Sequence, residues 1–204
     1  MDDATLRRAV EAVLFACSEP LPLARLEAVF APDGVEPARL TAALEALGAA
    51  SDDRGVEVQE VAGGWQLRTR SAFAGWVARL ETPKPVRFSR AALETLAVVA
   101  YRQPLTRAEV EEVRGVDCGG VLKSLLERGL VRAVGKKDVP GRPLLYGTAK
   151  RFLETFGLAT LAALPSLRDL GDLAAARAEE EPEPGGGEAA PLLPLASAEE
   201  DDGR

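Results

Sequence analysis

Residues 105–148 read LTRAEVEEVRGVDCGGVLKSLLERGLVRAVGKKDVPGRPLLYGT, and this stretch decides the fold. Thr106 and Glu109 have the spacing of a capping box that opens a helix, and Arg114-Gly115 ends that helix. A second helix is predicted over about 118–128, and Gly129 suits the position just after its end. The runs LVRAV and LLYGT then flank a loop and predict a β-hairpin.

The same order of elements occurs earlier in the chain. SEPLPLARLEAV (18–29) aligns with RQPLTRAEVEEV (102–113) at an offset of 84 residues, so that the Pro-Leu pair and the later apolar positions coincide. Upstream, AVLFACS (12–18) falls on LAVVAYR (96–102). This self-similarity predicts an internal duplication.

The first copy continues like the second. A helix is predicted over 36–50, and the run GVEVQEV-AGG-WQLRTR predicts a hairpin with its turn at Gly63-Gly64. Three helices followed by a two-stranded hairpin form a winged helix. The expected fold class is therefore mainly α with small β-hairpins (α+β), as two tandem winged-helix domains. The apolar residues that share one face of the 36–50 helix are Leu40, Ala43, Leu44 and Leu47.

Composition divides the chain into four parts. Residues 1–82 are the N-terminal winged-helix domain, 83–88 a proline-containing linker, and 89–178 the C-terminal winged-helix domain with trailing helices. An amphipathic helix is expected along AKRFLETFGLATLAAL, directly after the second hairpin. Residues 179–204 are rich in Glu, Pro and Gly and lack aromatics, which predicts a disordered tail.

Charge is distributed unevenly. The tail holds nine acidic residues and one basic residue, which accounts for more than the whole net charge of −7. Residues 1–82 carry −5 and residues 83–178 carry +6. The second domain is therefore basic, although the protein as a whole is acidic.

The residue inventory argues against catalysis. The chain has no histidine, which is the commonest general base and metal ligand, and its two cysteines cannot form a four-ligand zinc site by themselves. No enzyme activity, cofactor or metal is expected. Cys17 and Cys118 are expected to be buried free thiols, as in a reducing compartment. The start MDDATLRRAV does not resemble a signal peptide and no apolar run could span a membrane, which favours a cytoplasmic protein.

The loop of the second hairpin has three interpretations. A phosphate-binding loop requires four residues between its glycines and then Lys-Ser or Lys-Thr; Gly129 and Gly135 enclose five, and Lys136 precedes Lys137. The loop also leads into a strand, so no helix N-terminus could receive a phosphate.

Binding to DNA is the second interpretation. Winged helices often place their third helix in the major groove with the wing beside it. A tandem winged-helix transcription regulator is therefore the alternative function, but the acidic first domain argues against it. The residues expected to make weak DNA contacts are Lys123, Arg128, Lys136 and Lys137.

A protein partner is the third interpretation. Pro140 and Pro143 fix φ and stiffen the loop, so Arg142 between them has little entropy to lose on binding. Leu144 and Tyr146 share one face of the return strand, and Leu145 lies on the other. An apolar residue on the second face needs a cover, which is either the following helix or a partner chain.

The second half of the chain resembles a known protein family. The runs LAVVAYRQPLTRAEVEEVRG and PGRPLLYGT, followed by FLETFGL, closely resemble the second half of the bacterial segregation and condensation protein B (ScpB) family over residues 88–158. The resemblance implies tandem winged-helix homodimers paired through their N-terminal units. It also implies direct binding to ScpA, the kleisin, and contact with the SMC ATPase through that kleisin.

The implied role is a non-enzymatic, nucleoid-associated subunit for chromosome condensation and partition during cell division. Under it, Trp65 and Leu67 are expected at the dimer contact. A place in the core is the competing interpretation for Tyr101, Phe152 and Phe156, and it is the favoured one for these three. The residues expected at or beside the kleisin surface are Tyr101, Arg142, Leu145, Tyr146, Phe152 and Phe156.

Overall fold

The computed structural model describes residues 1–50, 54–80, 88–166 and 168–169, which form two compact units. Unit 1 contains Met1–Pro83 and Gly157–Thr160, and unit 2 contains Lys84–Phe156 and Leu161–Arg204. The predicted linker at 83–88, except for Phe88, and the predicted tail at 179–204 lie outside the described residues.

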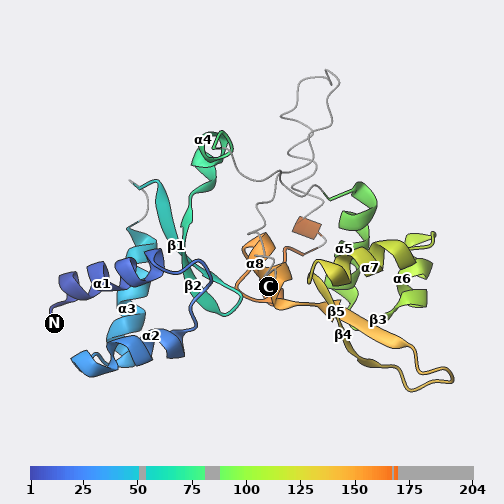
Figure 1. Cartoon of the computed structure of the whole chain (residues 1–204), viewed down its shortest axis with the longest axis horizontal. Helices are drawn as coiled ribbons and strands as arrows, with labels where there is room; N and C mark the ends of the chain where they lie inside the picture. Colours follow the sequence, from blue (N-terminus) through green and yellow to red (C-terminus); the bar gives the residue numbers. More distant parts are fainter. Residues whose placement is uncertain (51–53, 81–87, 167, 170–204) are drawn as a thin grey trace, which may run out of the picture. The chain divides into compact units, whose positions relative to one another are not determined.

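Three α-helices begin unit 1, and a two-stranded antiparallel sheet and a short fourth α-helix follow them (Figure 1). Asp2 caps its first helix, because the Asp2 carboxylate accepts a hydrogen bond from the Thr5 N–H at 2.7 Å. The strands pair from Val56 with Thr69 to Val61 with Gly64. The elements are α1(Asp3–Phe15), α2(Leu23–Phe30), η1(Ala31–Asp33), α3(Pro37–Ala49), β1(Val56–Val61), β2(Gly64–Thr69), η2(Ser71–Phe73) and α4(Ala74–Val77).

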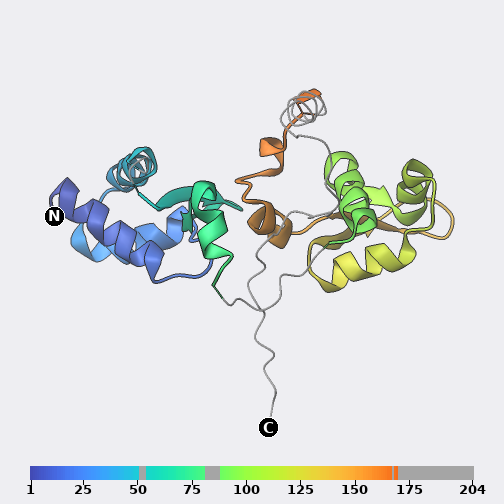
Figure 2. The same cartoon turned by 90° about the horizontal axis from the view of Figure 1, so that it is seen from above.

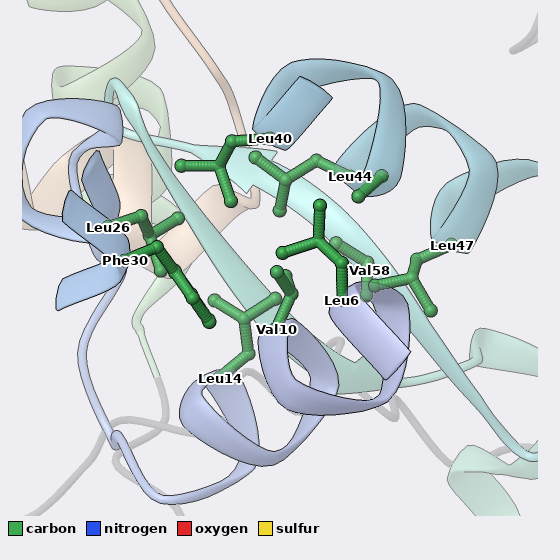
Figure 3. Close-up of a cluster of buried hydrophobic side chains, with 10 residues drawn as sticks. Leu6, Val10, Leu14, Leu26, Phe30, Leu40, Leu44, Leu47 and Val58 are labelled. Atoms are coloured by element: carbon green, nitrogen blue, oxygen red, sulfur yellow. The ribbon is translucent and has the colours of Figure 1, made fainter. Parts of the chain in front are cut away.

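The core of unit 1 is aliphatic. Side chains from α1, α2, α3 and β1 point toward one another and leave almost no exposed surface (Figure 3). The four apolar residues predicted to share one face of α3 are its buried residues, which confirms that helical pattern. The labelled members of the core are Leu6, Val10, Leu14, Leu26, Phe30, Leu40, Leu44, Leu47 and Val58.

The turn of the first hairpin differs from the prediction. Gly64 pairs with Val61 and belongs to β2, so the two turn residues are Ala62 (φ 52°) and Gly63 (φ 73°). Two successive positive φ values give the twist of a type I′ turn, which is the turn preferred in two-residue hairpins. The prediction of Gly63-Gly64 was therefore wrong by one residue.

Unit 2 repeats the arrangement with a three-stranded antiparallel sheet in the order β3-β5-β4. Its helices α5, α6 and α7 pack together beside the sheet (Figure 2), and the far end of the β4–β5 hairpin extends beyond them (Figure 1). The predicted capping box at Thr106 and Glu109 is present, and Gly115 ends that helix with φ 70°. The elements are α5(Arg90–Arg102), β3(Leu105–Thr106), α6(Arg107–Arg114), α7(Gly119–Glu127), β4(Val131–Lys136), β5(Leu144–Thr148), α8(Lys150–Phe156) and η3(Leu161–Ala163).

The helix expected along AKRFLETFGLATLAAL is shorter than predicted. It ends at Phe156, because Gly157 adopts a left-handed φ of 65°. Residues 157–160 belong to unit 1, where the carbonyls of Leu158 and Ala159 accept hydrogen bonds from Ala62 and Gly63 at 2.8 and 3.1 Å. These backbone contacts take the place of further helix.

The duplication is visible in burial as well as in element order. Leu26 and Val110, which are 84 residues apart, are both completely buried. The next apolar pair, Val29 and Val113, is 43% and 41% exposed. Equivalent positions therefore face the same way in both units.

Gly64 is expected to be essential for the stability of unit 1. A Cβ at this position would lie 2.9 Å from backbone carbons of Pro20 and Leu21, which cannot move aside as a side chain could. We predict that Gly64→Ala destabilises the protein by about 1–3 kcal/mol, measured by thermal unfolding. Gly75→Ala is the matched control, because a Cβ there meets open space; equal stability of the two variants would contradict this account.

Candidate functional site

The described residues include acidic side chains and two free cysteines, half-buried Cys17 and buried Cys118. No group of three or more acidic, cysteine or histidine side chains that could hold a metal ion is found among them. Burial raises the pKa of the Cys118 thiol, which makes it a poor nucleophile at neutral pH. No helix within the described ranges is long and apolar enough to cross a bilayer.

The β4–β5 hairpin, residues 131–148, is the most prominent surface feature of unit 2, and we call it the wing. Its register shifts between Ala133 and Gly135, which marks a β-bulge. β3 pairs with the base of β5, where Thr106 faces Leu145. Since the sheet order is β3-β5-β4, β4 is an edge strand of this sheet.

One carboxylate ties the wing to α6. Glu109 Oε2 accepts hydrogen bonds from the Thr106 N–H at 2.7 Å and the Thr106 hydroxyl at 2.8 Å, and Glu109 Oε1 accepts one from Lys137 Nζ at 2.5 Å. The hydrogen bond from Lys137, followed by those from Thr106, lowers the pKa of Glu109 to about 2. Glu109 therefore completes the predicted capping box and also anchors the wing.

The tip of the wing is a tight turn. Pro140 and Gly141 occupy its central positions, Gly141 has φ 83°, and the Arg142 N–H donates to the Val139 carbonyl at 2.8 Å. Pro followed by a positive-φ glycine is the sequence of a type II turn. Arg142 itself has φ 40°, a left-handed conformation that is costly for a residue other than glycine.

A hollow of about 380 Å³ lies between the start of α6 and the return strand of the wing. Leu144, which is 43% exposed, and Tyr146 line it from the same face of β5. The full lining is Thr106, Arg107, Ala108, Glu111, Pro143, Leu144 and Tyr146.

The family follows from comparison with known sequences. The profile of the segregation and condensation complex subunit ScpB family matches residues 8–167. The chain belongs to this family.

Relatives in this family cover most of the chain. Segregation and condensation protein B of Syntrophotalea carbinolica is 51% identical over 85% of this chain and 87% of its own. The protein of the same name from Moorella thermoacetica is 47% identical over 89% of this chain and 90% of its own.

Two solved structures are also similar in sequence. The crystal structure of ScpB from Mycobacterium tuberculosis is 36% identical, covering 78% of this chain and 98% of its own, with a TM-score of 0.35. A dimer of an ScpB N-terminal domain complexed with an ScpA peptide is 29% identical, covering 41% of this chain and 96% of its own, with a TM-score of 0.35.

The residues expected at the kleisin surface occupy three kinds of environment. Phe152 is buried and packs its ring 4.8 Å from that of half-buried Phe156, as the core interpretation expects. Tyr101 is half-buried, and its hydroxyl donates to the Pro165 carbonyl at 2.7 Å. Arg142 is exposed, and it has no side-chain hydrogen bond or ion pair within the described part of the chain.

The return strand displays a different leucine from the one singled out in the sequence. Leu145 is half-buried opposite Thr106, whereas its neighbour Leu144 is exposed at the hollow together with Tyr146. Sequence reasoning missed Leu144 as a surface residue, although the alternation along LLYGT places it beside Tyr146. Pro143 and Arg107 were also missed, because their proximity depends on the β3–β5 pairing.

The cations expected to touch DNA are mostly engaged within unit 2. Lys137 pairs with Glu109, and Lys123 lies 3.8 Å from Glu127. Arg128 stacks over the Phe88 ring at 5.3 Å. Lys136 alone of the four is exposed with no such partner in the described ranges.

The residues expected at the dimer contact pack within unit 1. Trp65 and Leu67 are half-buried against its core, and Trp65 exchanges two backbone hydrogen bonds with Leu21 at 2.8 and 2.9 Å. The large apolar side chains that the described part of unit 1 exposes lie elsewhere, and three of them, Phe73, Trp76 and Leu80, follow β2. The full set is Met1, Phe15, Val29, Phe73, Trp76 and Leu80, exposed by 46%, 80%, 43%, 40%, 64% and 66%.

The Glu109 anchor predicts a pH-dependent stability. Because its pKa is lowered from 4.5 to about 2, Glu109 stabilises the folded state fully above pH 4.5, and this contribution is lost as the pH falls toward 2. Glu109→Gln is therefore expected to lower Tm at pH 7, with a difference from wild type that shrinks below pH 4.5 and vanishes near pH 2.

Glu112→Gln is the control for this experiment. Glu112 is an exposed acid on the same helix with no side-chain partner in the described ranges, so its removal is expected to leave Tm unchanged across the same pH range. The proposed role of Glu109 would be contradicted if the difference in Tm between wild type and Glu109→Gln stayed constant from pH 7 to pH 2.

Proposed function

We propose that the protein is a non-catalytic, homodimeric subunit of a condensin-like complex for chromosome condensation and partition. In this proposal the wing of unit 2 binds the ScpA-type kleisin directly, and the SMC ATPase is reached through that kleisin. The family assignment supports a role as a subunit of the segregation and condensation complex. A transcription regulator is less well supported, because three of the four cations expected on DNA are engaged within unit 2.

The observation that carries the proposed kleisin surface is the exposed, strained Arg142 beside an apolar hollow. Prolines on both sides of Arg142 restrict the backbone that carries its unpaired guanidinium, so this backbone loses little entropy when a carboxylate binds. Leu144 and Tyr146 lie on the same strand and offer apolar contact next to that charge. Buried aromatic and arginine side chains commonly dominate the binding energy of protein interfaces.

The dimer contact is proposed to lie on unit 1. Phe73 and Trp76 have ring centroids 6.0 Å apart, and Leu80 follows within one turn of Trp76 in sequence. Each of these side chains is 40% exposed or more, which is unusual for large apolar residues so close in sequence. We place the contact on this patch in addition to the region of Trp65 and Leu67.

Substitution of Arg142 tests the kleisin surface. We predict that Arg142→Glu weakens kleisin binding at least about tenfold in calorimetry, and that Arg142→Gly weakens it too without lowering Tm, because glycine adopts φ 40° without strain. Lys123→Glu, a charge reversal on α7 outside the hollow, is the matched control and is expected to bind normally. Unchanged affinity of folded Arg142→Glu would refute the proposed surface.

Sedimentation tests the dimer. The double variant Trp76→Glu/Leu80→Glu is expected to raise the dimer Kd at least about tenfold, since two large apolar anchors become charged. Val113→Glu/Val116→Glu places the same charges on exposed valines of unit 2 and is expected to leave the dimer intact. If Trp76→Glu/Leu80→Glu had the same dimer Kd as wild type, the dimer contact would not include this patch.

A further inference from the structure

The hollow beside the wing has the chemistry of a site for a short apolar segment with acidic flanks. Its lining includes Ala108, Pro143, Leu144 and Tyr146, so most of its contact surface is apolar. Arg107 at its edge is already held by Glu111 at 2.6 Å and Asp117 at 2.5 Å, which leaves little positive charge there to be satisfied.

Unsatisfied positive charge lies further along the wing. Arg142 and Lys136 are exposed, and within the described part of the chain neither has a carboxylate partner. The wing as a whole carries four basic residues and one acidic residue. A ligand that fits would therefore place apolar side chains in the hollow and carboxylates toward the tip.

The chain itself contains such a segment. Residues 188–202 read EAAPLLPLASAEEDD, in which an apolar run is followed by four consecutive acids. Pro191 and Pro194 favour an extended polyproline II conformation with three residues per turn. In that conformation Leu192 and Leu195 lie on the same side, so both can enter one apolar hollow.

Charge and chain length both permit this contact. Residues 179–204 carry nine acids and one base, opposite in sign to the wing. The 23 residues from Asp169 to Leu192 can span up to roughly 75–80 Å, several times the radius of gyration of about 13 Å expected for a 100-residue domain. A tethered ligand has an effective concentration on the order of millimolar, so even a weak contact would be populated.

We propose that residues 188–202 dock on the wing of the same chain. Leu192 and Leu195 occupy the hollow against Leu144 and Tyr146, and the acids at 199–202 face Arg142 and Lys136. The tail thereby covers this face until a partner with a better fit displaces it. This proposal is independent of the proposed function, since its test involves no other protein.

The test compares amide spectra of the ¹⁵N-labelled full chain with those of the variant Leu192→Ser/Leu193→Ser/Leu195→Ser. Docking predicts that the amides of Arg107, Leu144 and Tyr146 shift between the two, while those of the first hairpin, such as Gln59, do not. Adding the synthetic peptide 188–202 to the variant is expected to return the wing amides toward their wild-type positions. Identical wing spectra and no response to the peptide would overturn the proposal.

Two further measurements define the contact. Arg142→Glu in the tail variant is expected to raise the peptide Kd about fivefold at low salt and less at 0.5 M NaCl, because exposed ion pairs are screened. Lys123→Glu is the matched control and should bind the peptide normally. A peptide with the same acids but with its leucines replaced by serines is expected not to bind. If it binds as tightly as the original peptide, the contact is purely electrostatic and the leucines do not occupy the hollow.

Mixed dimers separate the tail of the same chain from that of a second copy. Docking within one chain predicts that the wing amides of the ¹⁵N-labelled tail variant keep their positions when unlabelled wild-type chains exchange into the dimer. Wing amides that move toward their wild-type positions in the mixed dimers would mean that the other copy supplies the tail, which contradicts the proposal as stated.

Discussion

The wing of unit 2 is held by one carboxylate, that of Glu109, whose two oxygens bind different partners. Glu109 closes the capping box with Thr106, and its second oxygen holds Lys137 just beyond the end of β4. Thr106 is also the last residue of β3, which pairs with β5. Glu109 thus joins the start of α6 and the last residue of β3 to the wing at Lys137, where the paired part of the hairpin ends and its loop begins.

Internal pairing of charges reduces the free positive charge of unit 2. Its sequence is basic, but many of its cations are paired with carboxylates or, for Arg128, lie over an aromatic ring. Exposed ion pairs are worth at most about 1 kcal/mol, so this pairing weakens the attraction of these cations for another anion without abolishing it. On the wing, Arg142 and Lys136 are exposed without a carboxylate partner in the described part of the chain, and the exposed apolar side chain of Leu144 is paired with Lys136 across the strands.

The duplicated units show how one scaffold can present two different surfaces. Leu26 and Val110 are buried equally, and the aliphatic cores are built from matching helix faces. The differences lie outside those cores: unit 1 follows its hairpin with exposed Phe73, Trp76 and Leu80, whereas unit 2 lengthens its hairpin into the wing. Residues that do not maintain the core are free to change, so function diverges there first.

Features that depend on neighbouring residues could be predicted from the sequence alone. Capping at Thr106, the buried face of α3 and the duplication follow from spacing along the chain, and the family follows from the resemblance of the motifs in residues 88–158. The contacts between distant residues required the tertiary structure: Lys137 with Glu109, Tyr101 with Pro165, and Leu144 with the hollow beside α6. The first depends on the register of β4 and its β-bulge, where a shift of one residue moves a side chain to the opposite face. The second joins residues 64 apart in the chain, and the third depends on the pairing of β3 with β5, so no local pattern encodes either.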